Sequence, residues 1–141
     1  MSISTKGRYG LRAMIDMAVH ADESPVSVRS IAERQKISES YLEQVFATLR
    51  KGGLVRAVRG AGGGYTLALP PEKITAGRIL KLLEGSLSPV FCAGSAECPD
   101  STQCGNEKQC PVYPFWSELN KRIDEYIESV TLKELSLKNN A

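Results

Sequence analysis

The stretch that decides the fold is ISESYLEQVFATLRKGGLV, residues 37–55. Ser38 is a residue type that favours a helix N-cap, and the apolar residues after it recur every three or four positions. Gly52 and Gly53 are typical of a helix C-terminus. The stretch therefore predicts a helix from Ser38 to about Lys51, and its buried face consists of Leu42, Val45, Phe46 and Leu49.

Two more helices are predicted before this stretch. The first has an apolar face at helical spacing and ends near Asp22, before Pro25; the face consists of Leu11, Met14, Ile15, Ala18 and Val19. A short helix from Val28 to Gln35 follows, capped by Ser27. Its predicted buried residues are Val28, Ile31 and Ala32, and Lys36 and Ile37 form a tight turn to the next helix.

A hairpin is predicted directly after the stretch. LVRAVR (54–59) and YTLAL (65–69) alternate as strands do, and GAGGG (60–64) lies between them. Helix, short helix, turn, helix and glycine-tipped hairpin make up a winged helix-turn-helix. The fold class is therefore predicted to be mainly α with a small β-hairpin.

The second half of the chain predicts a connecting helix and a long helix. Thr75 caps the connecting helix, which Gly85 ends; its expected buried side is Ile79, Leu80, Leu82 and Leu83. Pro114 suits the first turn of the long helix, whose apolar stripe is Trp116, Leu119, Ile123, Tyr126, Ile127 and Val130. Because the small winged domain cannot cover so wide a stripe, the long helix is predicted to pair with a second copy in a homodimer.

The predicted domain boundaries follow from these elements. Residues 1–85 form the winged helix-turn-helix, 86–112 a cysteine-rich loop, and 113–135 the dimerisation helix with a short last helix. The last helix opens with the capping box Thr131–Glu134, and 136–141 is a tail expected to fray.

Composition limits the partners and the location. The net charge of +2 is unevenly distributed. Residues 1–70 carry ten Lys or Arg and six Asp or Glu, a net charge of +4, whereas residues 71–141 carry eight and ten, a net charge of −2. A basic front half suits an anionic partner. No apolar run reaches the roughly 20 residues of a membrane span, and the start lacks a secretory apolar region. We expect a cytoplasmic, nucleoid-associated protein without a membrane partner. No Ser/His/Asp set, nucleotide loop or paired carboxylates indicates an enzyme.

Residues with DNA-binding potential lie on the helix after Ser38 and on the hairpin. Short polar groups near a helix N-terminus suit the major groove, where Gln pairs with adenine and Glu accepts from cytosine. Basic residues at the other end of the helix suit phosphates, and an arginine beside glycines suits a narrow minor groove. The candidate residues are Ser38, Ser40, Tyr41, Glu43, Gln44, Arg50, Lys51, Arg59, Gly60 and Gly63, with Arg56 beside them. Ser4, Thr5, Lys6 and Arg8 could add contacts to the DNA backbone.

Four cysteines, the only ones in the chain, form a metal-binding candidate at Cys92, Cys98, Cys104 and Cys110. Each gap holds five residues, longer than the C-x2–4-C pairs that favour zinc. Four thiolates meet the requirement of a 2Fe–2S or 4Fe–4S cluster. Zinc and a reversible thiol switch stay open, whereas structural disulfides are not expected in a reducing compartment.

Several segments together resemble a known family. STKGRYGLRAM (4–14), residues 37–55, VRGAGGGYTLA (58–68) and ITAGRILKLLEG (74–85) are similar to the Rrf-two family of bacterial winged-helix regulators. The resemblance covers about residues 1–135, and the cysteine loop is most similar to members that control iron–sulfur cluster biogenesis. It implies a homodimer with crossed long helices, a two-fold double-stranded DNA operator and a 2Fe–2S cluster supplied by iron–sulfur assembly proteins.

The resemblance also implies a ligand set. Family members place a C-x5-C pair before the tryptophan of the long helix, which matches Cys104 and Cys110, and the first ligand would be Cys92 or Cys98. Cluster-biogenesis regulators have a histidine three positions after the last cysteine, and this position is Tyr113 here. The extra cysteine is its substitute, giving all-cysteine ligation. His20, the only histidine, is interpreted as a surface or packing residue.

The expected function is cluster-dependent regulation of iron–sulfur biogenesis genes. The alternative is a repressor of the same family that senses nitric oxide or redox state, or controls cysteine metabolism. Such a repressor would use the cysteines as a thiol switch or a zinc site.

Overall fold

The computed structural model describes residues 2–21, 25–90, 92 and 110–139. Its elements are α1 (Thr5–Val19), α2 (Val28–Gln35), α3 (Glu39–Lys51), β1 (Val55–Val58), β2 (Gly64–Leu67), η1 (Pro71–Lys73), α4 (Ala76–Glu84), α5 (Tyr113–Ser129) and α6 (Leu132–Asn139). The strands form one antiparallel pair in which Val55 faces Leu67 and Val58 faces Gly64. The predicted fold class is confirmed: the helices dominate and the hairpin is the small β element.

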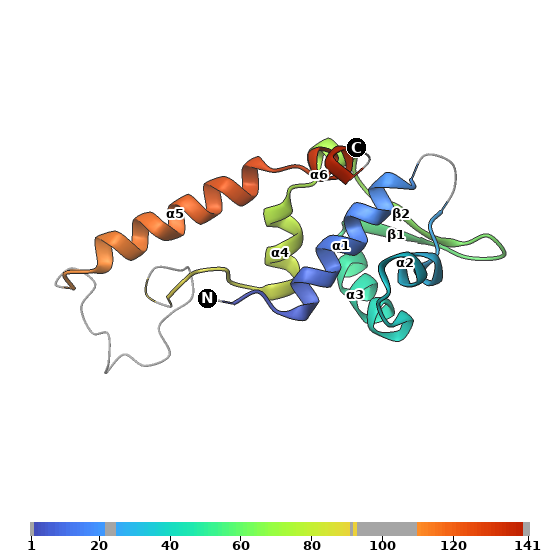
Figure 1. Ribbon diagram of the computed structural model, residues 1–141, viewed down its shortest axis with the longest axis horizontal. Helices are drawn as coiled ribbons and strands as arrows, with labels where there is room; N and C mark the ends of the chain where they lie inside the picture. The colour runs from blue at the N-terminus through green and yellow to red at the C-terminus, as the bar shows by residue number, and fades with distance from the viewer. Residues whose placement is uncertain (1, 22–24, 91, 93–109, 140–141) are drawn as a thin grey trace.

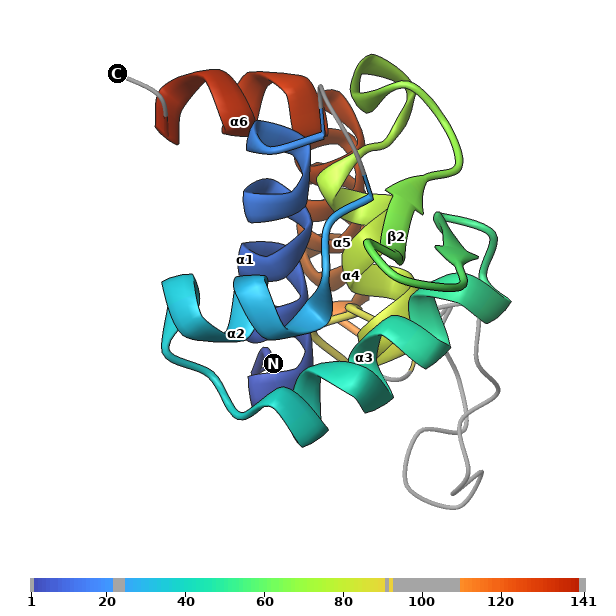
Figure 2. The same ribbon diagram turned by 90° about the vertical axis from the view of Figure 1, so that its right-hand side faces the viewer.

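Helix α1 is the centre of the core. It contacts α2 and α3 on one side and α4 and α6 on the other (Figures 1 and 2). Of the predicted apolar face only Met14 is fully buried, while Ala13 and Met17 are buried too and Leu11 and Ile15 are half-buried. The predicted face is incomplete because α1 has neighbours on both sides, so a single stripe does not describe its burial.

The helix-turn-helix follows its local sequence closely. Ser27 accepts a hydrogen bond from the Ser30 amide at 3.1 Å, and α2 spans the predicted residues. Lys36 adopts the left-handed conformation (φ 56) that ends α2 and turns the chain. The expected buried residues of both helices are confirmed: Val28, Ile31, Ala32, Leu42, Val45, Phe46 and Leu49.

The hairpin is held at its base and projects at its tip. Val26, between α1 and α2, exchanges two backbone hydrogen bonds with Tyr65 (2.8 and 2.9 Å). The Tyr65 ring lies 4.9 Å from the Phe46 ring of α3. Beyond this anchor Val58 is 40% exposed, so the distal hairpin forms a wing.

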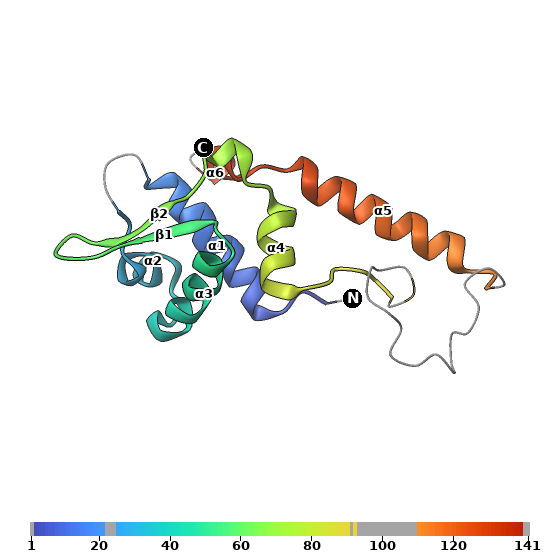
Figure 3. The same cartoon turned by 180° about the vertical axis from the view of Figure 1, so that it is seen from behind.

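Helix α5 projects from the end of the molecule opposite the wing (Figures 1 and 3). Pro114 lies in its first turn as predicted, and none of its residues is fully buried. Phe115 is 62% and Tyr126 70% exposed. Its C-terminal end is anchored where Ala76 donates to the Val130 carbonyl and Leu132 donates to the Ile74 carbonyl, both at 2.8 Å.

The end of the chain differs from the sequence-based prediction. A fraying tail was expected from Ser136, but α6 continues to Asn139. Thr131 caps it as predicted, accepting from the Glu134 amide at 3.2 Å. The helix persists because it packs on α1, where Leu132 is fully buried and Ser136 nearly so. Across the described ranges, no helix has the length and apolarity needed to cross a membrane.

Candidate nucleic-acid interface and cysteine segment

Helix α3 presents a polar face opposite its buried one. The exposed residues of this face are Ser40, Glu43, Gln44, Arg50 and Lys51, with Ser38 at the N-cap. Ser38 Oγ accepts from the Tyr41 amide at 3.4 Å and lies 3.0 Å from Ser40 Oγ. Both hydroxyls therefore stand at the start of the helix, where amide groups already favour anions.

Tyr41 has a packing role that the sequence did not reveal. Its side chain is half-buried, and its ring meets that of Tyr9 on α1 edge-on, at 6.0 Å and 88°. The guanidinium of Arg12 lies over the Tyr9 ring, 5.3 Å from the ring centre. Its Nη2 also donates to the Gln35 carbonyl at 2.6 Å, so α1 holds both the end of α2 and the start of α3.

The wing tip depends on its glycines. Gly60 has a φ of 101°, a conformation that residues with a side chain rarely adopt. The Gly63 amide donates to the Gly60 carbonyl at 2.9 Å, and a Cβ on Gly63 would overlap the carbonyls of Gly60 and Val58. Arg59 precedes this turn and is exposed. The glycines thus keep the turn compact, and a long cationic side chain stands directly beside it.

Several cations of the surface around α3 and the wing lack carboxylate partners. Within the described part of the chain, no ion pair involves Arg50, Lys51, Arg56 or Arg59, whereas Arg29 pairs with Glu33 at 3.3 Å. Cations that are not neutralised locally remain available to an external anion. The structure leaves the predicted residues of α3 and the wing exposed except Tyr41 and Gly63, which are half-buried. The individual roles of all of them in DNA binding stay predictions.

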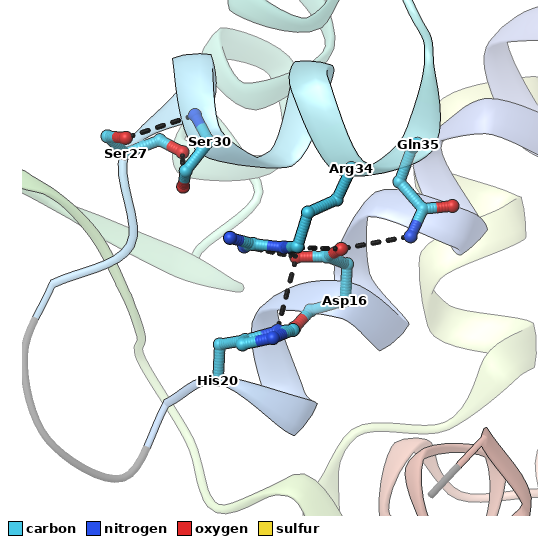
Figure 4. A network of polar contacts seen from close by, with 6 residues as sticks. All are labelled: Asp16, His20, Ser27, Ser30, Arg34 and Gln35. Atoms are coloured by element: carbon cyan, nitrogen blue, oxygen red, sulfur yellow. Dashed lines mark hydrogen bonds and ion pairs between the residues drawn. The ribbon is translucent and has the colours of Figure 1, made fainter.

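A buried carboxylate fixes α2 against α1 (Figure 4). Asp16 is 3% exposed and accepts from Arg34 Nε at 3.0 and 3.1 Å, from Arg34 Nη2 at 2.6 Å and from Gln35 Nε2 at 2.9 Å. The hydrogen bonds to Asp16 raise the pKa of Arg34 above its ordinary value and outweigh the opposing effect of burial. His20 lies beside the pair, with Nδ1 3.5 Å from Asp16 Oδ1 and its side chain 45% exposed, in agreement with its interpretation as a surface or packing residue.

This network was not predicted from the sequence, although the sequence contains a signal for it. Asp16 lies among the apolar residues Met14, Ile15 and Met17, and an acidic residue in such a position needs a partner when buried. The partner could not be read from spacing, because it comes from another helix.

Only part of the cysteine segment lies within the described residues. Cys92 and Cys110 are half-buried free thiols, while Cys98 and Cys104 fall outside the described ranges. Among the described residues no group of three or more metal-ligating side chains is present. The donor set itself suits a cluster or zinc, because thiolates bind both.

Cys110 is joined directly to α5. Its carbonyl accepts from the Tyr113 amide at 3.3 Å, just before the helix begins. Further along α5, the carboxylates of Asp124 and Glu128 each lie 3.3 Å from Nζ of Lys81 on α4. Glu128 also accepts a hydrogen bond from Thr75 Oγ1 at 2.9 Å. These polar contacts tie α5 to α4.

The pKa of Lys81 is raised by this arrangement. Burial alone would lower it, but the hydrogen bonds to Asp124 and Glu128 together outweigh burial. The ammonium is therefore held in its charged form where α4 meets α5.

A recognition helix, a basic wing and a projecting helix define a winged helix-turn-helix DNA-binding regulator. The chain belongs to the Rrf2 family, described as "Iron-dependent Transcriptional regulator", which it matches over residues 3–138. It is accordingly a transcriptional regulator rather than an enzyme.

Similar proteins support the family, and their names indicate two different functions within it. The chain is 42% identical over 139 residues to the HTH-type transcriptional regulator IscR of Aliivibrio salmonicida, covering 99% of this chain and 79% of the relative. It is similar in structure to T. potens IscR, with 42% identity, a TM-score of 0.76 and coverage of 100% and 89%. It is also similar to CymR, the global cysteine regulator of B. subtilis, with 40% identity, a TM-score of 0.78 and coverage of 98% of each chain.

Proposed function

We propose that the chain is a homodimeric regulator that binds a two-fold DNA operator and responds to an iron–sulfur cluster held by its cysteine segment. The observation that carries the sensing proposal is the position of Cys92 and Cys110. The first follows the end of α4 and the second precedes α5, and both thiols are free and half-buried. A group bound by these thiols would lie in the segment that links the two helices.

DNA binding is assigned to α3 and the wing. Gln44 and Glu43 would meet base edges in a major groove, and Arg59 would enter the neighbouring minor groove. Arg50 and Lys51 would neutralise phosphates. The buried Asp16–Arg34 network holds α2 so that α3 is presented as a rigid element.

Dimerisation is assigned to α5. Its apolar residues Phe115 and Tyr126 are largely exposed in the single chain, and a projecting helix with such a stripe buries it by pairing with a second copy. A two-fold dimer would present two copies of α3 to successive turns of DNA.

Iron–sulfur assembly proteins are the proposed source of the cluster, 2Fe–2S is the proposed type, and biogenesis genes are the proposed targets. When bound, a cluster supplies sensitivity to oxidants and to iron supply. The residues of the chain contribute thiolate donors, from Cys92, Cys98, Cys104 and Cys110. Cys92 and Cys110 lie next to structured elements, Cys92 after α4 and Cys110 before α5. Ligation of these two thiols would therefore restrict how the segment leaves α4 and enters α5. We place the protein in the cytoplasm, associated with the nucleoid.

The test is purification without oxygen, followed by a visible spectrum and by iron, sulfide and zinc analysis of the same sample. Near-equal iron and sulfide in coloured protein supports the cluster, and single Cys→Ala changes then identify its ligands. Colourless protein that binds zinc or no metal after reconstitution refutes the cluster.

The similarity to CymR favours a second candidate, a cysteine-metabolism repressor that uses its thiols or zinc directly. Its test is the DNA affinity of cluster-free protein before and after diamide. A change that dithiothreitol reverses supports the thiol switch, and an unchanged affinity refutes it.

A further inference from the structure

The last turn of α4 is fitted to three glycines. Leu82, Leu83 and Glu84 are consecutive, and their side chains occupy the space that a Cβ would take at Gly52, Gly10 and Gly7, respectively. Gly52 follows α3, whereas Gly10 and Gly7 lie in α1. Side chains from one turn of α4 thus pack against α1 and against the C-terminal end of α3, at glycines that allow this close approach.

Glu84 caps a helix that has no cap of its own. The Ser4 side chain makes no capping bond to α1, and no acidic residue lies in its first turn. Instead Glu84 Oε1 accepts from the Ser4 amide at 2.9 Å, the Gly7 amide at 3.0 Å and Ser4 Oγ at 2.5 Å. A carboxylate at this position satisfies free amides and complements the positive end of the helix.

The last turn of α4 is connected to both ends of the recognition helix α3. At the C-terminal end of α3, Leu82 packs on Gly52 directly. At its start, Tyr41 packs edge-on against Tyr9, which lies in the α1 segment that Glu84 caps. A displacement of the last turn of α4 would therefore alter the position of α3 at both ends.

The same turn adjoins the cysteine segment. Gly85, with a φ of 82°, ends α4 directly after Glu84, and its amide donates to the Lys81 carbonyl at 2.8 Å. Leu87, two residues on, is buried, so the first residues of the segment are held against the folded chain. Between Glu84 and Cys92 there are only seven residues.

We propose that Glu84 is a positioning residue for DNA binding. It holds the first turn of α1 and, through Tyr9, the start of α3. The last turn of α4 thereby transmits the state of the cysteine segment to both ends of the recognition helix. The second part of this inference rests on the proposed cluster-sensing function, whereas the first part requires DNA binding alone.

The test uses the full-length chain with a duplex selected by the unaltered protein from a random pool, and an unrelated duplex of equal length. Glu84→Gln removes the charge and keeps the size. Gly7→Ala keeps the carboxylate but places a methyl group where Oε1 lies. Glu72→Gln, an equal charge change on an exposed residue outside α4, is the control.

Both test variants are expected to weaken binding of the metal-free protein to the selected duplex by roughly fivefold, the effect of losing a typical helix cap. Glu72→Gln should leave the affinity within about twofold. The ratio of affinities between cluster-loaded and metal-free protein should also move toward one in the two test variants and not in the control.

Lower thermal stability with unchanged metal-free affinity would reduce Glu84 to a structural role and overturn the proposal. An altered affinity with an unchanged loaded-to-free ratio would overturn the transmission part. If either variant fails to fold, Ser4→Ala, which removes one of the three donors, gives the same comparison with a milder change. Recovery of no duplex by the unaltered protein refutes the proposed function instead.

Discussion

Replacing Asp16 by alanine removes the only fully buried carboxylate of the described residues. Charge-assisted hydrogen bonds contribute about 1.5–3 kcal/mol each, so the two sides of the Arg34 fork would suggest a loss of roughly 3–6 kcal/mol. The Arg34 side chain is 35% exposed and regains water when its partner is lost. We therefore expect a loss of about 2–3 kcal/mol in the free energy of unfolding, below the range of fully buried pairs.

Urea denaturation at one fixed protomer concentration measures this loss, because the stability of a dimer depends on concentration. Asp16→Asn should lose less, since an amide oxygen still accepts from Arg34. Glu33→Ala, which removes an exposed partner of Arg29, is the matched control and should cost well under about 1 kcal/mol. A loss for Asp16→Ala no larger than that of Glu33→Ala would refute the reasoning that this network fixes α2.

Three further predictions concern the wing, the long helix and its tether. Arg59→Ala should weaken DNA binding roughly tenfold and reduce the salt slope by about one, whereas Arg122→Ala on α5 should change neither; equal effects would refute wing insertion. Ile123→Glu should convert the dimer to monomer in sedimentation experiments and Lys121→Glu should not, while a dimer that persists in both would refute pairing through α5. Lys81→Met should lower the thermal stability at neutral pH. The difference in stability between variant and unaltered protein should disappear as the pH rises beyond 10.5, because a raised pKa means that the ammonium stabilises the fold until it deprotonates. A difference that does not depend on pH would contradict the ion-pair tether.

The recognition helix and its partner were predictable because their determinants are local. Ser27 and Ser38 cap the helices, Lys36 turns the chain and the apolar spacing defines the buried faces. The wing was predictable for the same reason, since its glycines mark a turn that other residues cannot form.

Contacts between distant segments were beyond sequence reasoning. The α1 face was incomplete because the position of α4 and α6 on its far side cannot be read from periodicity. Ser4 carries a residue type that suits an N-cap, yet the cap of α1 comes from Glu84, 80 positions away from Ser4. Similarly, the last residues form helix rather than tail because Leu132 finds a buried site on α1.

The described structure divides into parts of unequal packing. Behind α3 the side chains of Phe46, Leu42 and Leu49 are completely buried, whereas α5 has no fully buried residue. Elements with few buried contacts open and shift at lower free-energy cost than elements in a dense core. Ligation at the cysteine segment would therefore reposition α5 before it disturbed the internal structure of the helix-turn-helix, and the closely packed last turn of α4 would pass a smaller displacement to α1 and α3. Under the proposed function, a signal at the cysteine segment would alter how the recognition helix is presented and would leave the fold of the helix-turn-helix intact.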